Sequence, residues 1–142
     1  MNKPLLIIAD ADCIVAQSFA DDTHHKTTLA LVQKLDKIGG HILFPSTAIA
    51  EAITTLQRKF SNPQLAASTL ELFTDPSIDI ENVDQEAIRE ARKLFNPNSS
   101  KHNTLFDCIV ATVAKKHNAD AIFSFDNWYD KLGFKLAIDL FN

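Results

Sequence analysis

Four acidic residues stand in or directly after apolar segments of the chain: Asp10, Glu51, Asp107 and Asp126. A carboxylate in such surroundings is costly unless a partner compensates its charge. No nearby Lys or Arg is placed to pair with Asp10, Asp107 or Asp126. Hard oxygen ligands without an obligatory His or Cys favour Mg²⁺ or Mn²⁺ over zinc. The acids therefore predict a metal site that activates water and neutralises charge on a phosphate.

Helix capping offers a competing explanation for acidic residues in this chain. With 18 Asp and Glu among 142 residues, some must stand at helix starts, where a carboxylate suits the positive end of the dipole. This explains Asp21, Asp84 and Glu51. It explains Asp107 and Asp126 less well, because both have large apolar neighbours in the sequence.

The elements that must position these acids alternate along the sequence. Short apolar runs predict strands at residues 4–10, 41–44, 77–83, 121–123 and 134–138. Helical spacing predicts helices at residues 13–19, 22–38, 45–60, 63–73, 85–95 and 104–117. Asp21 or Asp22 is expected to cap the second helix, and Asn103 the last. Strands that alternate with helices predict a parallel sheet covered on both faces, in one three-layer α/β domain spanning residues 1–142.

Such a sheet binds ligands beyond the carboxyl ends of its strands. Asp10 ends the first strand, and Glu51 lies early in the helix after the second. From Asp107 the helix runs back roughly 15 Å over about 10 residues, and the strand leading to Asp126 returns roughly 17 Å. The two lengths nearly cancel, so all four acids should meet at one rim.

Four segments resemble the PIN-domain ribonucleases, and most closely the toxins of VapBC-type toxin–antitoxin pairs: Ile8–Val15, Phe44–Glu51, Asp107–Ala114 and Ala119–Tyr129. The resemblance implies a three-layer α/β/α fold around a parallel sheet. It also implies an endoribonuclease that depends on Mg²⁺ or Mn²⁺ and cleaves RNA phosphodiester bonds. The catalytic metal ligands that it implies are Asp10, Glu51, Asp107 and Asp126.

Two further residues, Asp12 and Ser124, lie two positions away from acids of this set and take part in the same resemblance. Ser124 corresponds to the family's Ser or Thr two residues before the last acid, where a hydroxyl can orient a ligand or a water. Asp12 stands where the family usually has Asn, Ser or Thr. We expect Asp12 to cap the following helix rather than to bind metal directly.

The implied partners are an RNA substrate, a cognate antitoxin and a second copy of the chain. A housekeeping RNA-processing nuclease and an inactive RNA-binding PIN domain remain alternatives. A haloacid-dehalogenase-like phosphatase fits poorly, because Ile14 stands where that family has Thr or Val. A receiver domain is nearly excluded, since the mid-chain acid Glu51 is expected within a helix.

Composition limits how the chain could bind nucleic acid and where in the cell it could work. The net charge of −4 argues against binding nucleic acid through bulk positive charge. Cys13 and Cys108 form no CxxC pair, so we expect buried free thiols in a reducing cytoplasm. The longest apolar run near the start, Leu5–Ala9, is too short to span a membrane, and no leader cleavage site follows it.

Other polar and aromatic residues carry weaker signals. The five histidines are expected at the surface or in the core, although His102 could touch RNA from the loop before Asp107. Trp128 and Tyr129 could stack on bases or pack beneath the last strand. Lysine and arginine side chains that could contact phosphates, or simply be solvated, are Arg58, Lys59, Lys101, Lys115 and Lys116.

Overall fold

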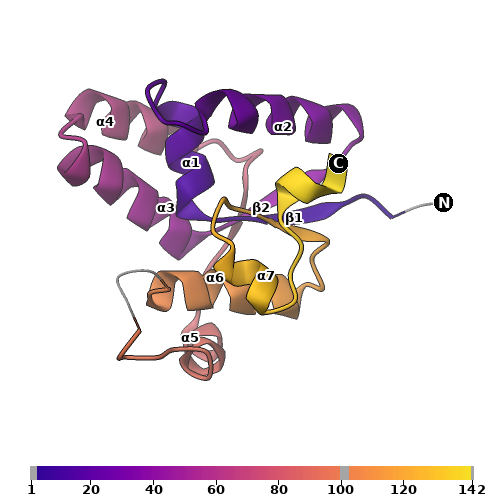
Figure 1. Ribbon diagram of the computed structural model, residues 1–142. Helices are drawn as coiled ribbons and strands as arrows, with labels where there is room; N and C mark the ends of the chain where they lie inside the picture. Colours follow the sequence, from indigo (N-terminus) through magenta and orange to yellow (C-terminus); the bar gives the residue numbers. More distant parts are fainter. Residues whose placement is uncertain (1–2, 100–102, 142) are drawn as a thin grey trace.

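The computed structural model describes residues 3–99 and 103–141, which fold around a parallel four-stranded sheet (Figure 1). Its strands are β1 (Leu6–Ala9), β2 (His41–Pro45), β3 (Asp79–Glu81) and β4 (Ala121–Phe123). They lie in the order β3-β2-β1-β4, and every neighbouring pair is parallel. Parallel neighbours need a crossover connection, usually helical, so the strands' carboxyl ends share one edge.

Helices cover both faces of this sheet. They are α1 (Ala11–Ser18), α2 (His25–Lys37), α3 (Ser46–Thr54), α4 (Pro63–Leu72), α5 (Gln85–Arg92), α6 (Leu105–Lys116) and α7 (Trp128–Lys131). A π-helical turn, Thr55–Lys59, extends α3. Figure 1 shows α2 on one side of the sheet and α5 with α6 on the other, which confirms the predicted three-layer α/β/α arrangement. In the described part of the chain, no helix is long and apolar enough to cross a bilayer.

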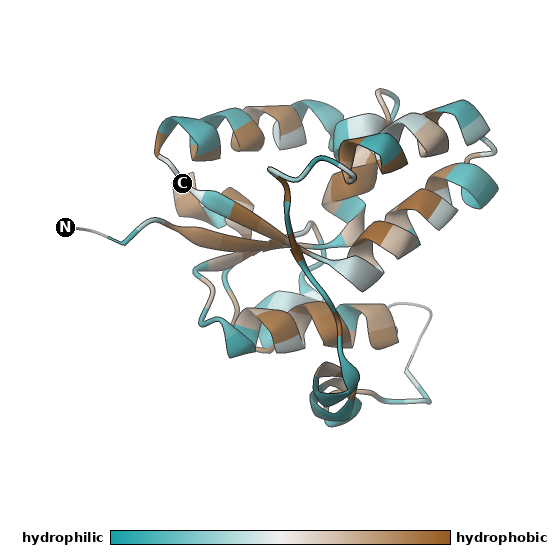
Figure 2. Cartoon of the chain, turned by 180° about the vertical axis from the view of Figure 1, so that it is seen from behind, coloured by the Kyte–Doolittle hydropathy of each residue, from teal (hydrophilic) through white to brown (hydrophobic). Residues whose placement is uncertain are grey.

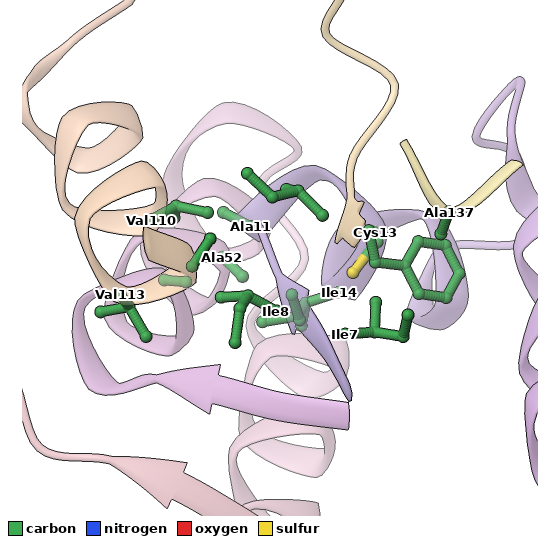
Figure 3. Close-up of a cluster of buried hydrophobic side chains, with 14 of the residues drawn as sticks. Ile7, Ile8, Ala11, Cys13, Ile14, Ala52, Val110, Val113 and Ala137 are labelled. Atoms are coloured by element: carbon green, nitrogen blue, oxygen red, sulfur yellow. The ribbon is translucent and has the colours of Figure 1, made fainter. Parts of the chain in front are cut away.

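The central strand β1 anchors the core. Ile7 and Ile8 are fully buried, and Figure 3 shows them clustered with Ile14 of α1 and with Val110 and Val113 of α6. Figure 2 shows the central strands mostly in hydrophobic colours and α5 mostly in hydrophilic ones. Burying each large aliphatic side chain stabilises the fold by about 1.5–3 kcal/mol, so this cluster fixes the edge where β1 ends.

Three local predictions were wrong. Thr104, not Asn103, caps α6, because the Thr104 side chain and Asp107 form a reciprocal capping box. His24 is the cap residue of α2, while Asp22 lies further upstream and accepts a hydrogen bond from the His24 amide. The expected last strand is reduced to one bridge between Ile122 and Leu136. The chain turns into a 3₁₀ helix at Ala137–Phe141 straight afterwards, so no ladder develops.

Candidate active site

An open cavity of about 280 Å³ contains all four acids that the sequence predicts at one rim of the sheet. Its lining residues are Asp10, Ala11, Asp12, Val15, Asp22, His24, Glu51, Thr55, Lys59, Phe60, Asp107 and Asp126. They come from the residue after β1, the starts of α1 and α6, the connection between α1 and α2, the α3 region with its π-helical turn, and the segment after β4. Residues separated by more than a hundred positions therefore share one cavity wall.

Asp10 lies at the base of this arrangement and is only 4% exposed. It caps α1, since its Oδ1 accepts a hydrogen bond of 2.7 Å from the Ala11 amide. Its Oδ2 accepts another, also 2.7 Å, from the Tyr129 hydroxyl. Burial raises the pKa of Asp10 well above its ordinary value, and the charges of Asp12 and Asp107 raise it further. The site thus resists placing a full negative charge here.

Asp107 occupies the first turn of α6. Its Oδ2 accepts a hydrogen bond of 2.9 Å from the Thr104 amide, and its Oδ1 lies 3.4 Å from the Tyr129 hydroxyl. Burial is the main cause that raises the pKa of Asp107. The Tyr129 hydroxyl therefore lies within reach of both Asp10 and Asp107. Because Tyr129 is fully buried and absent from the cavity wall, it approaches them from the core side.

Asp12 connects α1 to the segment after β4. Its Oδ2 accepts hydrogen bonds of 2.8 Å from the Ser124 hydroxyl and from the Phe125 amide. The Ser124 oxygen in turn accepts a 3.1 Å hydrogen bond from the Asp126 amide. The expectation that Asp12 caps a helix was wrong, because Asp10 takes that position. Asp12 and Ser124 instead hold the backbone that presents Asp126.

Glu51 approaches the cavity from α3 and is partly buried. Burial, followed by the charges of Asp107 and Asp12, raises its pKa to about 7. Burial likewise raises the pKa of Asp12 to about 6. Such shifts disfavour the charged forms, so at neutral pH the cavity gathers carboxylates that need a compensating positive charge.

The chemical type of the donor atoms in this cavity suits a hard divalent cation. It consists of carboxylate oxygens, and Asp12 Oδ1 is buried without a hydrogen-bond partner in the described residues. The ion pairs found among those residues include none of the cavity acids. In residues 3–99 and 103–141, however, no three acidic, His or Cys side chains are already arranged to hold an ion. The four aspartates of the cavity instead accept hydrogen bonds from the protein, so we expect that an ion would replace some of these bonds.

Several cavity residues escaped the sequence interpretation. Tyr129 was weighed only as a stacking or packing residue, yet it donates to Asp10. His24 is exposed, in agreement with the expected surface position, but it also lines the cavity, and its ring stacks on Phe125, with centroids 4.0 Å apart and planes 3° apart. The sequence gives little sign of the role of Tyr129, because this residue stands among polar residues such as Asn127, Asp130 and Lys131, although a buried Tyr hydroxyl usually finds a partner. Lys101 and His102 lie outside the described residues.

A larger cavity of about 770 Å³ lies between α5 and α6. Its acidic residues, Asp84, Glu86 and Glu90, are all exposed, and Glu90 pairs with Lys93. Exposed acids of this kind need no metal to compensate them. The smaller cavity therefore holds the unusual chemistry.

Comparison with known proteins places this geometry in context. Residues 7–135 match the model of the PIN domain family. VapC20 of Mycobacterium tuberculosis, a toxin that cleaves the sarcin-ricin loop, superposes with a TM-score of 0.78 at 17% identity, covering 90% of this chain and 95% of that one. VapBC2 of Rickettsia felis, solved with a DNA fragment from its promoter, gives 0.62 at 14% identity, with coverages of 93% and 96%. No curated protein sequence matched.

Proposed function

The chain belongs to the PIN domain family, and on this basis we propose that it is a metal-dependent endoribonuclease, the toxin of a toxin–antitoxin pair. The observation that carries the proposal is the gathering of Asp10, Glu51, Asp107 and Asp126 in the wall of one cavity. These four acids would hold Mg²⁺ or Mn²⁺. When bound, such an ion activates water and offsets negative charge on the scissile phosphate.

The chain's own residues prepare the site for this role. The Tyr129 hydroxyl and the Thr104 amide orient Asp10 and Asp107 from behind. Asp12 and Ser124 hold the segment that carries Asp126. Positioned partners of this kind behind metal ligands commonly tune metal affinity.

The proposed partners follow from the structural neighbours. The superposition on VapBC2, a toxin–antitoxin complex, supports a cognate antitoxin as partner, and we propose that this partner covers the cavity. We also propose a homodimer, and a cytoplasmic location that agrees with the buried free thiols of Cys13 and Cys108. A housekeeping RNA-processing nuclease would use the same cavity. An antitoxin gene beside this one would favour the toxin.

The test is digestion of total RNA by purified protein with Mn²⁺ and with EDTA. We expect cleavage only with the metal, and loss of cleavage in Asp10→Asn and Asp107→Asn while the far-UV circular dichroism stays unchanged. Asp36→Asn is the matched control, because Asp36 is exposed on α2 and takes no part in the cavity. Cleavage that persists in both cavity variants, or in EDTA, would overturn the assignment. RNA binding without any cleavage by the wild type would support the inactive RNA-binding alternative instead.

A further inference from the structure

We propose that the mouth of the acidic cavity is a subsite for one unpaired nucleotide of the substrate, with its base stacked on His24 and a neighbouring phosphate paired with Lys59. The inference rests on the proposed function, because it assumes that RNA is the ligand of this cavity. It goes further by naming the side chains of this chain that would hold the base and the phosphate.

The aromatic part of this subsite is the stacked pair of His24 and Phe125. The planes of the two rings are nearly parallel, 3° apart, and their centroids lie 4.0 Å apart. The Phe125 amide is held by Asp12, and the His24 amide donates to Asp22 Oδ1 at 2.8 Å. These bonds fix the backbone at both residues, and His24 itself lines the cavity. His24 is exposed, so the ring face that Phe125 leaves uncovered can receive a base.

Lys59 supplies positive charge at the same mouth. It is the sole Lys or Arg among the described residues that line the cavity, and it belongs to none of the ion pairs found among them. The π-helical turn that ends α3 places it next to Phe60, whose ring centroid lies 5.5 Å from its Nζ. A phosphate that approaches the carboxylates is repelled by them, so a cation at the entrance favours its approach.

The stacking contact requires the nucleotide to be unpaired, and the cavity beside it is small. Its volume of about 280 Å³ is slightly below the range of roughly 300–1,000 Å³ typical of small-molecule pockets. A base within a duplex has both faces covered by its neighbours and its edge paired, so it cannot offer a face to His24. Sequence-tolerant stacking of this kind is typical of single-strand recognition.

The experiment measures binding separately from cleavage. Fluorescence anisotropy, in the Asp107→Asn background with Mn²⁺, compares a labelled single-stranded RNA with a perfect duplex of the same sequence. The test variants are His24→Ala, His24→Phe and Lys59→Ala, and the controls are His41→Ala and Lys37→Ala, which are exposed away from the cavity. Thermal melting checks that every variant is folded.

We expect His24→Ala to weaken single-strand binding by about fivefold or more, since stacking on one base contributes about 1–3 kcal/mol. His24→Phe should restore most of this loss. Lys59→Ala should weaken binding and reduce the slope of log K against log salt by about 0.7, the value for one single-strand phosphate contact. Both control variants should bind like the parent, and the duplex should bind more weakly than the single strand.

Three results would overturn the subsite: single-strand binding unchanged in His24→Ala, no rescue by His24→Phe, or duplex and single strand bound equally well. An unchanged salt slope in Lys59→Ala would remove the phosphate contact. These outcomes differ from failure of the proposed function, which would appear as a wild-type protein that does not cleave RNA. Single-strand binding that depends on His24 in a non-cleaving wild type would keep the subsite and overturn only the nuclease.

Discussion

Replacing Tyr129 with Phe isolates the hydroxyl that reaches both Asp10 and Asp107. The ring is fully buried, and Phe keeps its shape, so the variant should fold. What it removes is the 2.7 Å hydrogen bond to Asp10 Oδ2 and the 3.4 Å contact with Asp107 Oδ1. If these acids bind a metal, the change should weaken metal binding, because the ionised form of Asp10 loses a donor that stabilises it.

The expected magnitude follows from the chemistry of that bond. A hydrogen bond to a charged group contributes about 1.5–3 kcal/mol, and loss of a partner behind a metal ligand typically reduces metal affinity about 10- to 100-fold. The lost hydrogen bond also normally lowers the pKa of Asp10 against the effect of burial. Its removal raises that pKa further, so protons compete more strongly with the metal. We therefore expect about a tenfold loss of Mn²⁺ affinity at pH 7.5, and a larger loss at pH 6.

Isothermal titration of Mn²⁺ into EDTA-stripped protein measures this change without requiring any activity. Trp128→Phe is the control, because its ring packs edge-on against Tyr129, with centroids 5.3 Å apart, and the bond that Trp128 makes to an acid, from its backbone amide to Asp126 Oδ1, is kept in the variant. We expect the control to bind Mn²⁺ like the wild type. A folded Tyr129→Phe protein whose affinity stays within twofold of the wild type at both pH values would refute the reasoning and reduce Tyr129 to a core residue.

The hydrogen bonds and burial of the site also determine stability. In EDTA, the melting temperature should fall as the pH rises from about 4.5 to 7, because Asp12 and Glu51 retain protons in the folded protein that they release in the unfolded chain. Differential scanning calorimetry should show a smaller fall in Glu51→Gln, and an equal fall would be contrary evidence. Ser124→Ala should lower the free energy of unfolding by about 1–3 kcal/mol and reduce cleavage, because it removes the hydroxyl that bonds both Asp12 and the Asp126 amide. Unchanged urea denaturation and unchanged cleavage would contradict this. Ile8 is fully buried in β1, so Ile8→Ala should lower the free energy of unfolding by about 2–5 kcal/mol, as measured by urea denaturation. The Mn²⁺ affinity of the folded protein, measured by titration, should stay unchanged.

The layers of the fold and the level of the acids followed from periodicity and element lengths. Apolar runs alternating with helical spacing define a parallel sheet, and the lengths of α6 and β4 return Asp126 to the level of Asp107. Both are one-dimensional properties that a sequence carries directly. The prediction of a last strand at residues 134–138 was wrong. The chain forms a single bridge at Leu136 and then turns, and apolar residues alone do not specify where the chain turns.

The contacts behind the acids could not be predicted in the same way. The bond from Tyr129 to Asp10 joins residues 119 positions apart, and the bond from Ser124 to Asp12 joins residues 112 apart. Each depends on side-chain direction to within a few tenths of an ångström. The same holds for His24, whose place in the cavity wall is set by a turn between α1 and α2. Sequence spacing brings elements together but does not orient the side chains on them.

Asp10 and Asp107 both take part in helix capping, yet capping alone does not account for their energetics. A carboxylate whose only role is to accept backbone hydrogen bonds has its pKa lowered, as Asp75 does through its bonds with Ser77. Asp10 and Asp107 also accept backbone hydrogen bonds, but burial and neighbouring carboxylates leave their pKa values raised. Their placement therefore opposes stability at neutral pH. A neutral cap such as Asn or Ser would serve the helices without that penalty, so the carboxylates are best explained by a ligand that requires their charge.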